Sequence, residues 1–338
     1  MAKASIPSTI GELGETGLLS LVFARLEEAK PDPSPLIVGP GDDTAYIAVN
    51  GPAVLATTDT MVRGRDWLDE WSSAADVGSK VVTQNLADIA SMGGVPTALL
   101  VTLVAPGSTP TAWALECMGA VAETAYDAGV SIAGGDLSSS NGEVSISVTA
   151  LGALGKGVTG PVLRSGAQPG HVLAVSAPLG RAAAGLALLR AADEGRFPPA
   201  EYAEACAAWV GYHCRPNPDL TAGVRAATAG ASAMIDVSDG LVRDAGRIAT
   251  ASGVRIDLDV AGITRSTRDL IGALGEGTAR ECVLHGGEEH VLLGCFAQNC
   301  VPSDWTLMGT LSECATSAAG VYIGGEPAPG GGWDHFGG

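Results

Sequence analysis

The sequence predicts an α/β (α+β) protein with two domains. The chain has 338 residues, enough for two hydrophobic cores, and 46% of them are hydrophobic. Apolar runs of strand length alternate with amphipathic stretches of helical period, and 47 glycines provide for tight turns. Residues 152–170, rich in glycine and proline, have the composition of an interdomain connection. We therefore expect domains at residues 1–155 and 156–338.

The first half is predicted to begin with a helix over residues 9–30, where Ile10, Leu13 and Leu18 recur at close to helical spacing. The prolines of residues 31–35 end this helix. Further elements follow from apolar periodicity and from glycine and proline breaks. Strands are expected at 36–38, 45–49, 54–58, 97–105 and 143–151, and helices at 76–92 and about 110–128.

The second half continues the same alternation of strands and helices. Strands are expected at 171–177, 233–237 and 254–260, and helices at 180–192 and 240–252. Gly253 stops the last of these helices. Between residues 283 and 296 a polar turn separates two apolar runs.

The composition excludes several classes of function. A formal net charge of −18 with few aromatic residues argues against nucleic acid, whose phosphates require a basic face. No run of 18 apolar residues indicates a membrane span, and the N-terminus lacks the apolar stretch of a secretory signal. The seven cysteines form an odd set without a Cys-x-x-Cys pair, which indicates thiols in a reducing cytoplasm.

Four acidic segments, which we interpret as turns, indicate the chemistry. Two unit charges about 4 Å apart repel by roughly 4 kcal/mol at an effective dielectric near 20, so a fold that gathers carboxylates needs cations. Oxygen ligands without thiolate or imidazole select magnesium, manganese or calcium, and magnesium usually shares its shell with substrate phosphates. The segments therefore predict phosphate chemistry. They are 41–44 (GDDT), 57–59 (TTD), 134–136 (GGD) and 236–240 (DVSDG).

Five residues in the chain have a local reason for a role in such a site. Asp236 closes an apolar strand, and Asp239 or Ser238 is placed to cap the next helix, whose start attracts phosphate; an ordinary cap also explains Asp239. Asp88 lies on the apolar stripe of its predicted helix, where an unpaired carboxylate is costly. Arg164 is the best-placed cation for a nucleotide phosphate, although a surface arginine would look the same.

Signatures of several other enzymes are missing from the sequence. It contains no G-x-x-x-x-G-K-[ST] loop, no kinase His-Arg-Asp set and no G-x-S-x-G elbow. His285 and His290 flank the segment GGEE, but their spacing is not His-Glu-x-x-His. We expect ordinary turn-flanking roles for both histidines.

Nine segments, taken in order, resemble one family. GELGE, GPGDDTA, TTD, NLADIASMGG, GGD, VLRSGA, DVSDGL, HGGEE and GWDHF extend from Gly11 to Phe336. They are similar to segments of bacterial thiamine-monophosphate kinases, which belong to the superfamily of aminoimidazole-ribonucleotide and selenophosphate synthetases. The resemblance implies ATP-dependent phosphorylation of thiamine monophosphate to thiamine diphosphate with several Mg²⁺ ions. It also implies a synthetase-like fold whose N-terminal mixed-sheet domain binds ATP and metal and forms a homodimer.

The resemblance also assigns roles to individual residues. Relatives carry a substrate-contacting His followed by Phe where this chain has Asp66 and Trp67, so either Asp66 attracts the cationic thiamine or the loop is rearranged. The GGED-aromatic motif of relatives keeps an acid here at Glu289. The implied metal ligands are Asp43, Thr57, Thr58, Asp59, Asp88, Asp136, Asp236 and Asp239; the ATP contacts are Gly135, Asp136, Arg164 and Ser238; the substrate contacts are Glu288 and Trp333, with Asp66 as a candidate.

Direct in-line transfer without a covalent intermediate is the expected mechanism, because the acceptor phosphate is itself a nucleophile. Three alternatives remain open. A sister synthetase would use another acceptor, but selenophosphate synthetases carry a reactive Cys in an N-terminal loop, and the first cysteine here is Cys117. A metal-dependent phosphatase would use the same aspartates to activate water. A nucleotide sensor would bind ATP without turnover.

Overall fold

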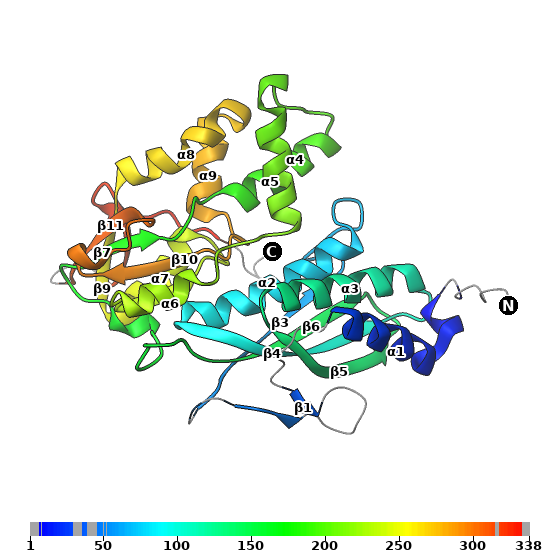
Figure 1. Cartoon of the computed structure of the whole chain (residues 1–338). Helices are drawn as coiled ribbons and strands as arrows, with labels where there is room; N and C mark the ends of the chain where they lie inside the picture. The colour runs from blue at the N-terminus through cyan, green and yellow to red at the C-terminus, as the bar shows by residue number, and fades with distance from the viewer. Residues whose placement is uncertain are drawn as a thin grey trace. The chain divides into compact units, whose positions relative to one another are not determined.

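The computed structural model describes residues 7, 9–29, 36–38, 46–49, 51, 53–314 and 318–332. The chain divides into two compact units, which are described separately below (Figure 1). Unit 1 comprises Met1–Ile89 and Pro96–Ala153, and unit 2 comprises Ala90–Val95 and Leu154–Gly338. Among the described residues, none of the helices is long and apolar enough to cross a membrane.

Unit 1 is built on a four-stranded sheet in the order β3-β6-β4-β5, in which β3 pairs antiparallel with β6 and β4 pairs parallel with β5. Strand β6 reads SISVTALGAL and buries every second residue, so one face of the sheet is covered and the other carries serine and threonine. The elements of this unit are α1 Ile10–Ala29, β1 Leu36–Val38, β2 Tyr46–Ile47, β3 Leu55–Val62, α2 Ala74–Ser91, β4 Gly94–Ala105, α3 Thr111–Asp127, β5 Ser131–Ser139 and β6 Ser145–Leu154.

Helices α2 and α3 lie on one side of this sheet (Figure 1). A Cβ on Gly78 of α2 would overlap the carbonyl oxygen of Cys117 in α3, so glycine permits the two helices to approach closely. The helix predicted over residues 9–30 is α1, but Gly14 interrupts it with φ 74° and ψ 166°. The predicted helices at 76–92 and 110–128 are confirmed as α2 and α3.

Two of the four acidic segments are not turns, and this interpretation was wrong. Residues 57–59 lie in the middle of β3, and residues 134–136 lie in the middle of β5. Gly and Asp are rare in strands, which is why both segments look like turns in the sequence. Both strands are edges of the sheet, where such residues are tolerated.

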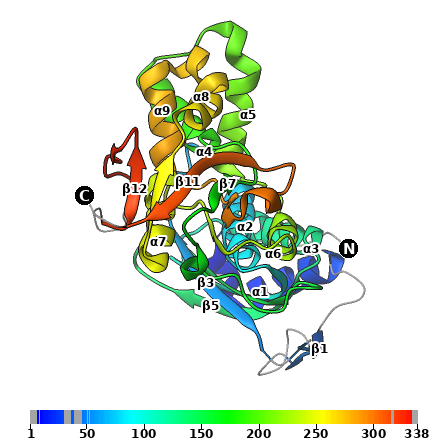
Figure 2. The ribbon, with the colours of Figure 1, turned by 90° about the vertical axis from the view of Figure 1, so that its left-hand side faces the viewer.

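Unit 2 is built on a seven-stranded mixed sheet in the order β13-β12-β9-β11-β7-β10-β8, in which β12 runs parallel to β9 and the other pairs are antiparallel. Figure 2 shows α5, α8 and α9 on one side of this sheet. The elements are β7 Val172–Val175, α4 Arg181–Asp193, α5 Ala203–Cys214, α6 Ala222–Thr228, β8 Ala233–Asp236, α7 Leu241–Ser252, β9 Val254–Leu258, α8 Val260–Leu274, α9 Glu276–His285, β10 Leu292–Phe296, β11 Thr306–Glu313, β12 Gly320–Ile323 and β13 Glu326–Pro327, with 3-10 turns at Arg164–Gly166, Ala200–Tyr202 and Gln298–Cys300.

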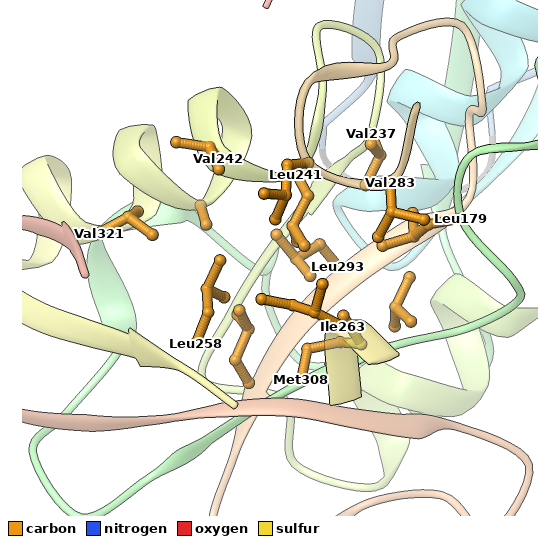
Figure 3. Close-up of a cluster of buried hydrophobic side chains, with 14 of the residues drawn as sticks. Leu179, Val237, Leu241, Val242, Leu258, Ile263, Val283, Leu293, Met308 and Val321 are labelled. Atoms are coloured by element: carbon orange, nitrogen blue, oxygen red, sulfur yellow. The ribbon is translucent and has the colours of Figure 1, made fainter. Parts of the chain in front are cut away.

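Strands β7, β10 and the edge strand β8 of unit 2 are buried along their whole length, because hydrophobic clusters cover both faces of this part of the sheet. Along β8, Ile235 contacts the larger core cluster and Met234 the smaller one on the opposite face. Figure 3 shows the larger cluster, to which Val237 and Leu241 belong together with side chains from β9, α8, α9, β10 and β11. Val237 and Leu241 are 0% exposed and flank the segment 238–240, so the core fixes both ends of that turn.

The segment Ala90–Val95, which comprises the end of α2 and the start of β4, belongs to unit 2. The backbone N–H of Gly155 donates to the carbonyl of Gly93 at 3.0 Å, and that of Val162 donates to Met92 at 3.1 Å. One element of unit 2 differs from the prediction. The strand predicted over 254–260 ends at Leu258, because the Asp259 side chain accepts from the N–H groups of residues 261 and 262 and starts α8.

Candidate functional site

In unit 1 the structure brings strand β3 and helix α2 together through polar side chains. The hydroxyl of Thr57 donates to Oδ2 of Asp88 at 2.7 Å, and Asp88 is half-buried. The backbone N–H of Asp59 donates to Oδ1 of Asn85 at 3.0 Å, and the Asn85 amide donates to the Val81 carbonyl at 2.8 Å. Asn85 is fully buried and positions the strand, a role that the sequence prediction missed although its place on the apolar stripe marked it.

Thr58 faces the opposite side of the sheet from Thr57 and Asp59, because successive side chains of a strand point to alternate faces. Its hydroxyl donates to the Val148 carbonyl at 3.1 Å and accepts from the Thr149 hydroxyl at 3.1 Å. Thr58 is therefore exposed on the uncovered face of the sheet, opposite the face on which Thr57 contacts Asp88.

Gly135 and Asp136 lie on β5, at the other edge of the sheet from β3. A Cβ on Gly135 would overlap the backbone of Val101, so the close pairing of β4 with β5 requires glycine there. Asp136 is exposed, and Ser138 donates to its Oδ2 at 3.0 Å. Two strands separate β5 from β3, roughly 14 Å at ordinary strand spacing, so the sheet does not bring Asp136 next to Asp59.

The loop that follows β3 contains Asp66. Its Oδ2 accepts from the backbone N–H of Val62 at 2.7 Å, and the Asp66 N–H donates to the Val62 carbonyl at 3.0 Å. Trp67 is 5% exposed, stacks on Trp113 at 6.2 Å between ring centroids, and donates to Asp69 at 3.0 Å. Asp66 thus closes its own turn, and the Trp67 ring is part of the core.

In unit 2 the end of β8 and the loop 286–290 form a second polar group. Asp236 is 4% exposed, and its Oδ2 lies 3.2 Å from Nδ1 of His290. The backbone N–H groups of Glu288 and His290 donate to the carbonyls of Ser238 and Val237 at 2.8 and 2.9 Å. His290 therefore contacts a proposed metal ligand directly, which is more than the turn-flanking role expected for it.

The helix cap expected at Asp239 or Ser238 was wrong. The N-cap is Gly240, with φ 113° and no side-chain cap, and Asp244 inside the first turn of α7 accepts from the N–H groups of Asp239 and Gly240 at 3.0 and 3.1 Å. Arg247 donates to Asp244 Oδ1 at 2.6 Å and also pairs with Asp239. Asp244 is fully buried, and desolvation, reinforced by the charge of Asp236, raises its pKa to about 7.

Arg164 and Ser238 are not neighbours within unit 2. The carbonyl of Arg164 accepts from the hydroxyl of Ser252, the last residue of α7, at 2.8 Å. Ser238 precedes the first residue of the same helix, which has 12 residues and a length of about 18 Å. A ligand contacting both residues would have to extend along the helix.

Two predicted site residues, Asp43 and Trp333, lie outside the described residues. The described chain reaches Gly332, which precedes Trp333 in the sequence. Gly332 has φ 103°, and a Cβ added to it would lie 2.5 Å from the Asp239 carbonyl and 3.1 Å from Arg243. A Cβ on Gly331 would meet the ring of His285. The segment before Trp333 is therefore packed onto the start of α7 and the end of α9.

The donor set of these groups suits a hard cation. Within the described part of the chain, no three Asp, Glu, His or Cys side chains lie close enough to form a preformed metal site. Magnesium commonly takes one or two carboxylates from the protein and completes its shell with water and substrate phosphates. The Thr57–Asp88 pair and the buried Asp236 meet that requirement, so the residues fit Mg²⁺ held jointly with phosphate.

Comparisons of the sequence and of the fold with known proteins indicate the same family. Residues 41–154 match the model of the N-terminal domain of AIR synthase related protein. The crystal structure of thiamine-monophosphate kinase from Stenotrophomonas maltophilia K279a is 29% identical, with a TM-score of 0.77, and the match covers 91% of this chain and 97% of that one. The structure of AaThiL complexed with AMPPCP and TMP is 28% identical, with a TM-score of 0.74, over 98% and 100% of the two chains.

The two sheets and these matches define a protein of two α/β units whose residues 41–154 match the N-terminal domain of AIR synthase related protein. Thiamine-monophosphate kinase from Mycobacterium tuberculosis is 39% identical over 97% of this chain and 93% of its own length. The chain belongs to the thiamine-monophosphate kinase family.

Proposed function

We propose that the chain transfers the γ-phosphoryl group of ATP to thiamine monophosphate and produces thiamine diphosphate. The observation that carries this proposal is the 39% identity with thiamine-monophosphate kinase over 97% of the chain. The structural similarity to AaThiL complexed with AMPPCP and TMP supports it, because AMPPCP is an ATP analogue and TMP names the acceptor.

The proposed metal ligands are the eight residues that the family resemblance implies. A bound Mg²⁺ would neutralise the charge of the transferring phosphates. The chain's own part is to hold its oxygen atoms in place: Asp88 is fixed by Thr57, Asp236 by His290, and the backbone of Asp239 by Asp244. Positioning and charge neutralisation dominate phosphoryl transfer, so these contacts are the expected source of rate enhancement.

ATP and substrate contacts are proposed for the remaining residues of the site. Arg164 is exposed on a 3-10 turn whose backbone is tied to α7, which leaves its guanidinium accessible to a phosphate. Glu288 is proposed to contact the cationic part of thiamine monophosphate, as is Trp333. Asp66, whose Oδ2 closes its own turn, is the weaker candidate for a substrate contact.

We also propose that the protein is a homodimer. Residues 1–155 would form the domain that binds ATP and metal and dimerises, and residues 156–338 would form the second domain. The face of the unit 1 sheet opposite α2 and α3 carries Thr58, Thr60 and Leu100 in exposed positions. An uncovered sheet face with an apolar residue is a suitable surface for a second copy.

All seven cysteines are free thiols, which suits the reducing cytoplasm predicted from the sequence.

The test is an assay with ATP, Mg²⁺ and thiamine monophosphate in which thiamine diphosphate and ADP are separated chromatographically. We expect both products in a one-to-one ratio, and no products after addition of EDTA. ADP without thiamine diphosphate would indicate a sister synthetase with another acceptor. Release of inorganic phosphate from thiamine monophosphate without ATP would indicate the phosphatase instead.

A further inference from the structure

The loop that carries Glu288 has an unusual backbone. Glu288 and His290 adopt positive φ angles of 61° and 54°, a conformation uncommon for residues with a side chain. The glycine before them is required, because a Cβ on Gly287 would overlap the Ser238 carbonyl. Such a backbone persists only where its surroundings hold it, so the orientation of Glu288 depends on the contacts of the loop.

Glu289 fastens this loop to the start of helix α4. Its side chain is 0% exposed, and its Oε1 accepts from the backbone N–H of Ala182 at 2.7 Å. Its Oε2 lies 3.6 Å from Nε of Arg181, the first residue of α4. Desolvation raises the pKa of Glu289 to about 7, and the charge of Arg181 acts in the opposite direction.

Helix α5 holds the same loop from a second direction. The hydroxyl of Tyr212 donates to the backbone carbonyl of Glu289 at 2.8 Å, and the guanidinium of Arg181 lies 3.9 Å above the Tyr212 ring. The next residue, His213, places Nδ1 3.3 Å from Oε2 of Glu288. The His213 side chain is 9% exposed, whereas that of Glu288 is 35% exposed. The Glu288 carboxylate therefore contacts a buried imidazole and is itself partly exposed to solvent.

We propose that Arg181, Tyr212 and His213 are positioning residues that hold the Glu288 carboxylate in the orientation in which it binds the cationic part of thiamine monophosphate. The inference rests on the proposed function, which assigns Glu288 to the substrate. A carboxylate whose orientation is set before binding loses less conformational entropy when the ligand arrives. The three residues therefore act on affinity for thiamine monophosphate and leave affinity for ATP unchanged.

The chain offers a matched control for Tyr212. Tyr322 is also buried, also donates its hydroxyl to a backbone carbonyl (Ala318, 3.1 Å), and also lies beneath an arginine, with Arg255 3.7 Å from its ring centroid. It lies on β12 and contacts no part of the loop 286–290 through these interactions. Tyr212→Phe and Tyr322→Phe thus remove the same kind of hydrogen bond, and a merely structural role predicts the same result for both.

The experiment measures the Kd of thiamine monophosphate by titration calorimetry with AMPPCP and Mg²⁺ present, for the full chain and each variant. We expect Tyr212→Phe to raise this Kd about fivefold, and Tyr322→Phe to leave it within twofold, with the Kd of AMPPCP unchanged in both. His213→Leu is expected to raise the Kd about tenfold, and His213→Asn, which keeps a nitrogen near the position of Nδ1, to restore most of the affinity.

Equal Kd values for the Tyr212→Phe and Tyr322→Phe proteins, whether both unchanged or both raised, would overturn the positioning role. So would equal effects of His213→Leu and His213→Asn. If the wild type binds and phosphorylates thiamine monophosphate in these cases, the proposed function stands and only the positioning role fails. A wild type that neither binds nor phosphorylates thiamine monophosphate would instead refute the proposed function, and the positioning role with it.

Discussion

The hydroxyl of Thr57 donates to the carboxylate of Asp88 across 2.7 Å and so links two proposed metal ligands on different elements, β3 and α2. Thr57→Val keeps the shape of the side chain and removes the hydroxyl. We expect the Mg²⁺ affinity to fall roughly 10- to 100-fold, the range typical for loss of a group that orients a metal ligand. The measurement is the Mg²⁺ dependence of the rate together with direct Mg²⁺ binding. Thr60→Val, on the exposed side of the same strand, is the control; equal effects of the two substitutions would contradict the assignment.

Asp59→Asn and Asp236→Asn test the two units separately. Each substitution preserves size and removes one negative charge. We expect turnover to fall by at least roughly 100-fold at saturating substrates, because charge neutralisation of the transferring phosphates is lost, with little change in the thermal midpoint. The measurement is kcat at limiting and at excess Mg²⁺. Near-normal kcat of either variant at limiting Mg²⁺ would show that its carboxylate is not a metal ligand.

Gly240→Ala tests the backbone before helix α7. Gly240 has φ 113°, and an added Cβ would lie 2.7 Å from the His285 carbonyl. We expect the free energy of unfolding to fall by about 1–3 kcal/mol or more. Gly246→Ala is the control on the same helix, because the nearest atom to its added Cβ is 4.0 Å away. That variant should gain roughly 0.5–1 kcal/mol from helix propensity, measured by urea unfolding; a stable Gly240→Ala protein would argue against the turn geometry.

Glu289→Gln tests the buried carboxyl of the GGEE loop. The pKa of Glu289 rises from 4.5 to about 7 on folding. Below pH 4.5 the carboxyl is protonated in both the folded and the unfolded state, so its ionisation does not change the free energy of unfolding. As the pH rises from 4.5 to 7 the unfolded chain ionises first, and the folded state loses stability relative to it, by roughly 3 kcal/mol in all. Because Gln cannot ionise, the stability of the variant relative to the wild type should increase over this window. Urea unfolding of both proteins at pH 5 and pH 8 measures this change. If the difference in free energy of unfolding between variant and wild type is the same at both pH values, the raised pKa of Glu289 is contradicted.

Leu100→Glu tests the proposed homodimer. Leu100 is 39% exposed on β4 of the unit 1 sheet, and a charge there would be buried by a second copy without a partner. We expect the wild type at about twice 33.8 kDa and the variant at 33.8 kDa by light scattering after gel filtration. Phe197→Glu is the control, since Phe197 is 76% exposed in unit 2. A monomeric wild type, or a dimeric Leu100→Glu protein, would refute this surface as the interface.

The sequence predicts the regular elements well where periodicity is strong. Helices α2, α3 and α7 and strand β6 follow from apolar spacing and from glycine stops. The segments 57–59 and 134–136 were misread because Asp and Gly are depleted in strands, and the pairing of an edge strand overrides that propensity. Helices α5, α6, α8 and α9 were not predicted.

The site was harder to predict than the fold because its support comes from residues far apart in the sequence. Asp88 could be singled out as a carboxylate on an apolar stripe, but its partner Thr57 is 31 positions away. Nothing local connects Glu289 to Ala182, 107 positions away, or to Tyr212, 77 positions away. The Asp244 cap was also missed: its side chain accepts from residues that precede it by four and five positions, a pattern without a sequence signature as short as the capping box.

The membership of Ala90–Val95 in unit 2 has a practical consequence for dissecting the protein. A gene fragment that begins at Leu154 would encode unit 2 without this segment. The N–H groups of Gly155 and Val162 would then lose their acceptors, and the backbone of Ala90 would no longer lie against Gly223. A recombinant second half should therefore be designed with residues 90–95 fused ahead of Leu154, and a single protease cut at the Gly- and Pro-rich stretch would not release an intact unit.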